Sequence, residues 1–127
     1  SRFCRGYFST VSTYLRDILN DGTRIVILED SYSTKLSPEN GTDLAASFSQ
    51  WSDEDKKNIM FVYCWVANRV LSQRDTVPTP SGFRSLEEWE TLFQKLGFVI
   101  EHESFLGFPA KRDINTPQSL LVTRIQK

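Results

Sequence analysis

Two adjacent carboxylates, Glu29 and Asp30, follow directly on the apolar run of residues 24–28, and Tyr32 comes two positions later. The run is rich in β-branched residues and predicts a strand buried on both faces, as in a parallel sheet covered by helices. Ligands bind beyond the carboxyl ends of such strands, so these three residues are candidates for substrate contact or acid–base chemistry. The alternative is that Glu29 ends the strand and Asp30 bonds to its own backbone in a turn.

A second candidate group lies near the end of a long predicted helix and comprises Trp65, Asn68, Arg69 and Arg74. The first three are adjacent or three to four positions apart, so they can share a face and line a substrate pocket. Arg69 would then hold a carboxylate or a phosphate. The alternative is that cationic residues here complement the helix dipole and that Trp65 belongs to the core.

His102 is the only histidine and stands between Glu101 and Glu103 on a predicted strand. Strict alternation would place both carboxylates on the face opposite the imidazole. No second histidine or cysteine pair has the spacing of a metal site. We therefore predict no metal site, and the sequence identifies no catalytic residue.

The elements that must position these residues can be read from periodicity and capping. A helix is expected over residues 7–20, ended by Gly22, and the polar stretch 33–50 is expected to be the least regular part of the chain. A helix beginning after Ser52 is apolar around most of its circumference, which indicates deep burial or packing against something outside this chain. Ser85 starts a further amphipathic helix that Gly97 ends. The remaining predicted elements are a connector at 77–83 and strands at 98–106 and 119–125, which should pair as an antiparallel hairpin.

Composition bounds the class of protein. The 127 residues include 15 basic and 16 acidic side chains and 39% hydrophobic residues, which suits one globular domain with a real core. The balanced charge does not indicate nucleic-acid binding, and no apolar run is long enough to cross a membrane. We interpret Cys4 and Cys64 as reduced thiols, so a cytoplasmic location is expected.

Residues 14–30 and 85–98 resemble the C-terminal half of a class I S-adenosylmethionine-dependent methyltransferase: the first segment looks like that family's helix and fifth strand, and the second like its last helix and sixth strand. The resemblance implies an α/β fold with a partial Rossmann-like sheet and about three helices. One buried strand of parallel type would be joined by a C-terminal antiparallel pair, with the last strand inserted between the fifth and the sixth. Residues 1–127 would form a single half-domain, and 33–80 a helical insertion.

The resemblance also implies which parts are missing. The family binds S-adenosylmethionine with a Gly-rich turn in its N-terminal half, whereas the six glycines here form no Gly-x-Gly cluster. We therefore expect this chain to supply the substrate side of a methyltransferase, to bind no cofactor alone and to be inactive in isolation. The open edge of strand 24–28 would pair with the missing N-terminal half or with a second copy. The alternative is a non-catalytic interaction or oligomerisation module.

Overall fold

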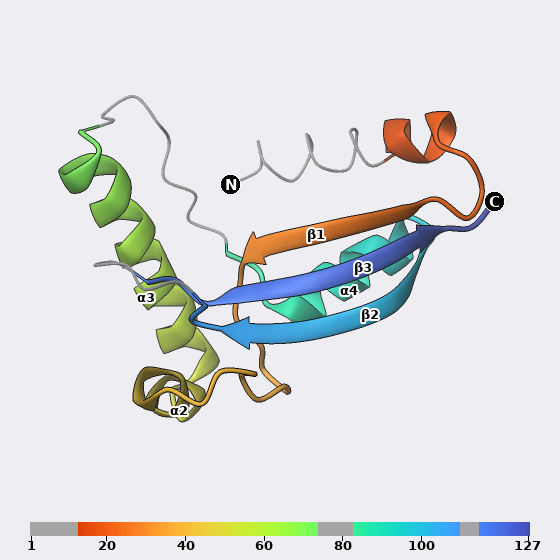
Figure 1. Ribbon diagram of the computed structural model, residues 1–127. Coiled ribbons are helices and arrows are strands. Elements are labelled where there is room, and N and C mark those ends of the chain that lie inside the picture. The colour runs from red at the N-terminus through yellow and green to blue at the C-terminus, as the bar shows by residue number, and fades with distance from the viewer. Residues whose placement is uncertain (1–12, 74–82, 110–114) are drawn as a thin grey trace.

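The computed structural model describes residues 13–73, 83–109 and 115–127, and it shows a mixed α/β fold. Strands β1 (Arg24–Asp30), β2 (Phe98–Gly107) and β3 (Gln118–Ile125) form one sheet in the order β1-β3-β2. β3 is antiparallel to both neighbours, so β1 and β2 run in the same direction on either side of it (Figure 1). The predicted hairpin and the predicted position of the last strand between the other two are confirmed.

Helices occupy the segments between these strands. Residues 13–18 are helical, and they are followed along the chain by α2 (Asp43–Ser49), α3 (Asp53–Trp65), the π-helix η1 (Val66–Leu71) and α4 (Leu86–Lys95). α3 and α4 begin after Ser52 and Ser85 as predicted, and Ser85 forms a complete capping box with Glu88. The first part of the predicted helix 7–20, Cys4, Arg74 and most of the connector 77–83 lie outside the described residues.

α2 corrects the expectation that residues 33–50 are irregular. Its N-cap is Thr42, whose hydroxyl accepts a hydrogen bond from the Ala45 N–H at 3.2 Å. The helix has only seven residues, too few to be stable alone, so tertiary packing must hold it. Ala45 and Phe48 supply that packing because both are buried.

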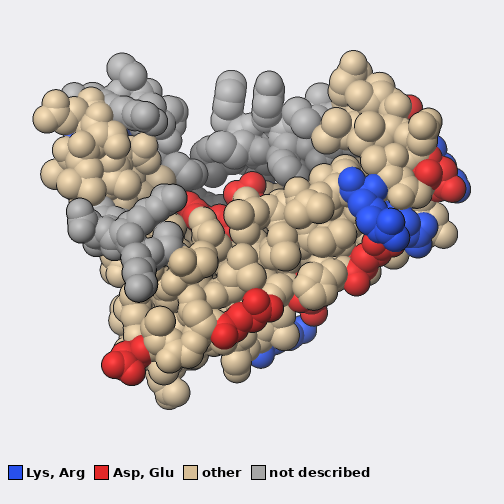
Figure 2. Space-filling view, in the orientation of Figure 1, with Lys and Arg blue, Asp and Glu red and all other residues tan. Residues whose placement is uncertain are grey.

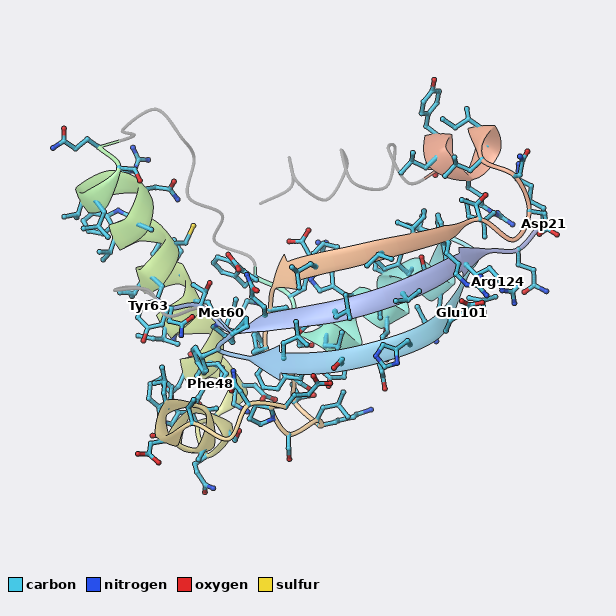
Figure 3. The ribbon with its side chains drawn as sticks, in the orientation of Figure 1. Asp21, Phe48, Met60, Tyr63, Glu101 and Arg124 are labelled. Atoms are coloured by element: carbon cyan, nitrogen blue, oxygen red, sulfur yellow. The ribbon has the colours of Figure 1, made fainter. Side chains whose placement is uncertain are left out.

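The core consists of two separate clusters of buried side chains. One joins α4 to one face of the sheet, and the other joins α2 and α3 to the carboxyl ends of β1 and β2 (Figures 1 and 3). The buried members of the first are Leu86, Phe93, Phe98, Leu121 and Ile125, and those of the second are Tyr32, Ala45, Phe48, Met60, Phe105 and Phe108.

The prediction that strand 24–28 is buried on both faces is wrong for half of its side chains. Ile25 and Ile27 pack into the cluster beneath α4, but Val26 is 67% exposed and Leu28 is 55% exposed. The physical reason is that none of the described helices covers the opposite face of the sheet, whose visible surface is largely uncharged (Figures 1 and 2). The continuous apolar run of β1 is the pattern of a strand with helices on both faces of its sheet, whereas the described helices cover only one face.

Replacing Thr123 with Val is expected to stabilise the protein by about 1 kcal/mol. Thr123 is fully buried on β3 between Ile25 and Ile100, and its hydroxyl has no hydrogen-bond partner among the described residues. An apolar group of the same shape removes this desolvated hydroxyl, and Val also favours strands. Urea unfolding measures the gain. Thr116→Val is the matched control: the Thr116 hydroxyl donates to Asp30, so a gain there as well would contradict the explanation.

Candidate functional site

The carboxyl end of β1 presents the two predicted carboxylates in different environments. Glu29 is exposed, and the described residues offer its side chain no hydrogen bond. Partial desolvation by the surrounding protein, followed by the negative charge of Asp30, raises the pKa of the Glu29 carboxyl above its ordinary value. Asp30 is anchored instead, because one of its carboxylate oxygens accepts from the Thr116 hydroxyl at 3.1 Å and from the Gln118 amide at 3.3 Å.

The last turns of α3 lie within electrostatic range of this strand end. Burial is the main reason why the pKa of the Cys64 thiol is raised; the negative charge of Asp30 raises it further, and a hydrogen bond from Asn68 opposes the shift. Asn68 donates its side-chain amide to the Cys64 carbonyl at 2.9 Å and to the Cys64 sulfur at 3.3 Å. Asn68 thus contacts Cys64, and the negative charge of Asp30 acts on the same thiol from the end of β1. Cys64 was not among the predicted site residues, since its apolar context resembles that of a core residue.

Asn68 and Arg69 belong to η1, the π-helical continuation of α3. The Asn68 side chain bonds to the Cys64 carbonyl four residues back, which is the acceptor that its own N–H would use in an α-helix. This competition gives a local physical reason for the wider turn. π-Helical turns are rare in proteins, and those that interrupt α-helices are often found at functional sites.

Trp65 and Asn68 have different surroundings, although they are only three residues apart. Asn68 is turned towards Cys64, whereas Trp65 is 46% exposed and lies about 100° around the helix from Cys64. Arg69 is partly buried and is the basic residue of the last turn of η1. The predicted group therefore divides between the strand end and an outward face of α3.

Tyr32 lies in the core and not on the surface of the site. It is 4% exposed and packs in the cluster that contains Phe48 and Met60. Burial, followed by the charges of Glu88, Asp53 and Glu87, raises its pKa to about 12, so the phenol is neutral at pH 7. Such burial leaves Tyr32 almost no surface with which to contact a substrate.

His102 is exposed on the uncovered sheet face, and one part of the alternation prediction is wrong. A β-bulge between Ile100 and His102 shifts the register of β2. Glu101 consequently reaches Arg24 on β1 and Arg124 on β3, at 2.6 and 2.9 Å. By the strand register it lies on the same face as His102. Figure 3 shows Glu101 beside Arg124. These arginines, through hydrogen bonds and charge, hold the pKa of Glu101 below its ordinary value. The basic group seen at this end of the sheet in Figure 2 is thus paired with acid.

No protein-family model, no curated protein and no solved structure matches this chain. The site is accordingly interpreted from its own residues.

The described residues do not fit S-adenosylmethionine. After β1 the chain continues through Ser31 and Tyr32, both buried, with no glycine to bring backbone close to a ligand. Gly22 and Gly97 have positive φ, but each lies in the turn between a helix and the strand that follows it. At Gly107 the side chains of Asn40 and Pro38 occupy the space beside the backbone, so no ligand could approach it there. The described ranges also hold no group of three His, Cys, Asp or Glu residues able to bind a metal ion, and none of their helices could span a membrane.

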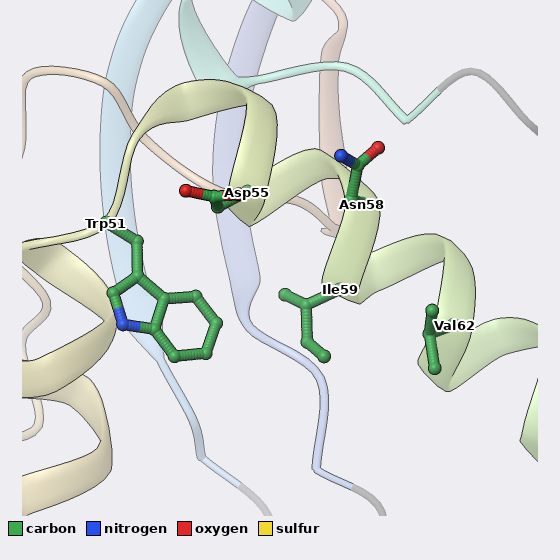
Figure 4. Close-up of a pocket in the computed structure, with 5 residues that line it drawn as sticks. All are labelled: Trp51, Asp55, Asn58, Ile59 and Val62. Carbon is green, nitrogen blue, oxygen red and sulfur yellow. The ribbon is translucent and has the colours of Figure 1, made fainter.

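Two surface pockets flank the helices. The first, of about 370 Å³, is lined by residues of α3 together with the Trp51 indole, and sequence reasoning missed it (Figure 4). The second, of about 400 Å³, lies at the start of α4 and contains Glu87. The Glu87 carboxylate accepts hydrogen bonds from the Ser33 hydroxyl and from the N–H groups of Thr34 and Lys35, so it holds the loop after β1.

Glu87→Gln is expected to lower the free energy of unfolding by about 1–3 kcal/mol at pH 7. Burial alone would raise the pKa of Glu87, because it disfavours the charged carboxylate. The hydrogen bonds from Ser33 and Thr34 favour the charged form by more, so the pKa lies below its ordinary value. A lowered pKa means that the stabilisation is complete above the ordinary value and is lost as pH falls through the folded value. The difference between wild type and variant should therefore shrink below about pH 4 in urea titrations.

The exposed Glu54, in the first turn of α3, offers the control Glu54→Gln. We expect a smaller loss there, because only the helix dipole favours its charge. An equal loss in both variants, or a Glu87→Gln effect that persists unchanged in acid, would contradict the assigned hydrogen bonds.

Proposed function

We propose that this chain is the C-terminal, substrate-side part of an S-adenosylmethionine-dependent methyltransferase whose cofactor-binding half is not in this chain. The observation that carries the proposal is the strand order β1-β3-β2 with the last strand antiparallel in the middle. This is the order that the resemblance of residues 14–30 and 85–98 to the class I family implies. The helix α4 leading through Gly97 into β2 agrees with the same resemblance.

The free edge of β1 supports the proposal because none of the described strands pairs with the backbone groups on that side. The Ile125 N–H donates to the Thr23 carbonyl, and the Ser31 N–H donates to the Pro117 carbonyl, both at 2.9 Å. The backbone groups of Thr23 and Ser31 therefore point towards β3. Backbone groups alternate in an antiparallel pair, so those of Val26 and Leu28 point to the free edge. The isolated backbone bridge between Tyr32 and Ser85 lies beyond the C-terminal end of β1, so it does not pair with the edge of the strand itself. An exposed edge of this kind is a ready template for pairing with another strand unless a helix or loop covers it.

The uncovered sheet face gives a second, independent line of support. Val26 pairs with Val122 and Leu28 with Leu120 on the face opposite α4, which makes an apolar strip across two strands. A face of this character normally packs against another layer. Helices of the missing half would cover this strip and a further strand would pair with β1.

In the complete enzyme, the end of β1 would form part of the wall around the methyl acceptor. Asp30 is held by two hydrogen bonds and can orient a donor group of the acceptor. Glu29 is exposed, and its raised pKa suits acceptance of a proton from the acceptor nucleophile. Methyl-acceptor identity would follow from which groups these carboxylates contact.

Calorimetric titration with S-adenosylmethionine tests the proposal, on this chain and on the protein that includes the residues encoded before Ser1. We expect binding only to the longer protein, with a strand and a Gly-rich turn upstream. In that enzyme, Glu29→Gln should raise KM for the acceptor and leave the cofactor Kd unchanged. Tight binding to the 127 residues alone would overturn the proposal. An upstream region without such a strand and turn would favour the non-catalytic interaction module instead.

A further inference from the structure

α3 has one side that packs in the core and an opposite side that is exposed and carries both polar and apolar residues. Met60 is fully buried, and Lys56 is buried beside Phe48 on the same side of the helix. On the opposite side, Val62 is 47% exposed and Trp65 is comparably exposed. The core therefore does not account for the second face.

The exposed face is a continuous stripe along the helix. Asp55, Asn58, Val62 and Trp65 follow one another at intervals of three and four residues, the spacing that places side chains on one side of a helix. All four are exposed. We call these four residues the α3 stripe.

A groove lies on the N-terminal half of the stripe. The Trp51 indole forms one wall, and Asp55, Asn58, Ile59 and Val62 form the other (Figure 4). Core contacts hold both walls in place, because the Trp51 ring lies 5.6 Å from the buried Phe48 ring and Ile59 packs against the same cluster. The groove is thus formed before any partner arrives, and Trp65 projects from the same helix beyond it.

A two-fold axis at Val62 would place Trp65 of one copy at the groove of the other. If two α3 helices pack antiparallel with Val62 of each at the axis, Trp65 of one copy lies opposite Ile59 of the other. That position is inside the groove, and symmetry repeats the contact on the other side. Tryptophan is among the residues most enriched at interface hot spots, which lie in well-packed, desolvated pockets.

The charges of the helix agree with the same arrangement. Acidic residues, Asp53, Glu54 and Asp55, fill the first turn of α3, and Arg69 stands in the last turn of η1. With Val62 at the axis, position 69 of one copy faces position 55 of the other. Opposite charges then meet at both ends of an antiparallel pair, whereas a parallel pair would set like charges side by side.

We propose that the α3 stripe binds the same stripe of a second copy of this chain, antiparallel, with Trp65 of each copy in the groove beside Trp51 of the other. This contact is independent of the proposed methyltransferase function because it leaves the free edge of β1 and the uncovered sheet face open. It also gives a use for the apolar surface of a helix that the sequence shows as apolar around most of its circumference.

Sedimentation equilibrium over a range of protein concentrations tests the proposal. We expect a monomer–dimer equilibrium in the wild type, and Trp65→Ala should weaken association by about 30-fold or more, the loss of a hot-spot residue. Val62→Lys, at the axis, should abolish the dimer. Both residues are exposed, so circular dichroism should show unchanged folding.

A charge exchange tests the orientation. Asp55→Arg and Arg69→Asp should each weaken the dimer, and the double variant should recover most of the association only if the two positions meet across the axis. Leu71→Asn is the matched control, since Leu71 is an exposed apolar residue of η1 away from the stripe. It should leave the dimer intact.

Val26→Pro separates this interface from pairing through β1, because it removes an N–H that points to the free edge. The dimer should survive that change. A monomer at all concentrations, a dimer insensitive to Trp65→Ala and Val62→Lys, or a dimer that Val26→Pro alone dissociates would each overturn the proposal.

Discussion

Replacing Phe48 with Ala is expected to lower the free energy of unfolding by about 3–5 kcal/mol. Phe48 is almost completely buried at the centre of the cluster that joins α2 and α3 to the sheet (Figure 3). Its ring meets that of Phe108 edge to face, with centroids 5.2 Å apart, and the Lys56 ammonium lies 5.8 Å from its centroid. The truncation therefore leaves a cavity. It also removes the aromatic ring that shields the Lys56 side chain from water.

The loss should extend beyond the cavity itself, because α2 has few other anchors. Ala45 is its only other buried residue, and a helix of seven residues does not persist without packing. The groove beside Trp51 should loosen too, since Phe48 supports that indole. Urea unfolding followed by circular dichroism measures the stability. Because the chain has three tryptophans, the emission of Trp51 is isolated by comparison with Trp51→Phe, and it reports on the groove.

Phe61→Ala is the matched control for Phe48→Ala. Phe61 lies on α3 and is 37% exposed, so removing its ring should cost about 1–2 kcal/mol, clearly less than the loss at Phe48. Equal losses in the two variants would mean that α2 is not held to the sheet through Phe48, and the assignment of the second core cluster would be wrong.

Helix starts and strand partners could be predicted because their signals are local. Ser52 and Ser85 satisfy N–H groups three residues ahead, so the capping residues fix where α3 and α4 begin. The short loop between β2 and β3 allows only an antiparallel return. α2 escaped prediction because it has only seven residues and follows Pro38, Asn40 and Gly41, which favour turns. Its stability comes from Phe48, which contacts residues near the end of β2 that are far away in sequence.

Burial and the candidate site could not be predicted in the same way. Val26 and Ile27 are equally apolar, and only the position of α4 decides which of them is covered. The influence of the Asp30 charge on Cys64 depends on how α3 is placed relative to the end of the sheet. The bulge that turns Glu101 towards Arg24 and Arg124 leaves no mark on the alternation of β2 in the sequence. These features follow from tertiary geometry rather than from periodicity.

Gly107→Ala is expected to lower the free energy of unfolding by about 2–5 kcal/mol, the sum of backbone and steric costs. Gly107 ends β2 with φ of +73°, which residues with a side chain rarely adopt. A Cβ there would lie 2.5 Å from the Asn40 side-chain oxygen and 2.8 Å from the Pro38 Cβ. The Asn40 amide can rotate, but the proline ring cannot, so the 38–40 segment must move.

That movement would break contacts along the outer edge of β2. The Glu39 N–H donates to the Phe105 carbonyl at 2.9 Å, and the Glu39 carboxylate accepts from the buried Ser104 hydroxyl. This segment therefore protects the β2 edge from solvent in the way that a further strand would. Hydrogen exchange at Glu39 should accelerate in the variant along with the fall in stability.

Gly22→Ala separates the two costs, because Gly22 has a similar φ of +81° with nothing within 4 Å of the added Cβ. Only the backbone cost applies there, about 1–2 kcal/mol. A Gly107→Ala loss no larger than that of Gly22→Ala, measured by urea unfolding, would show that the 38–40 segment yields without cost. The contact between this segment and β2 would then not be part of what holds the edge of the sheet closed.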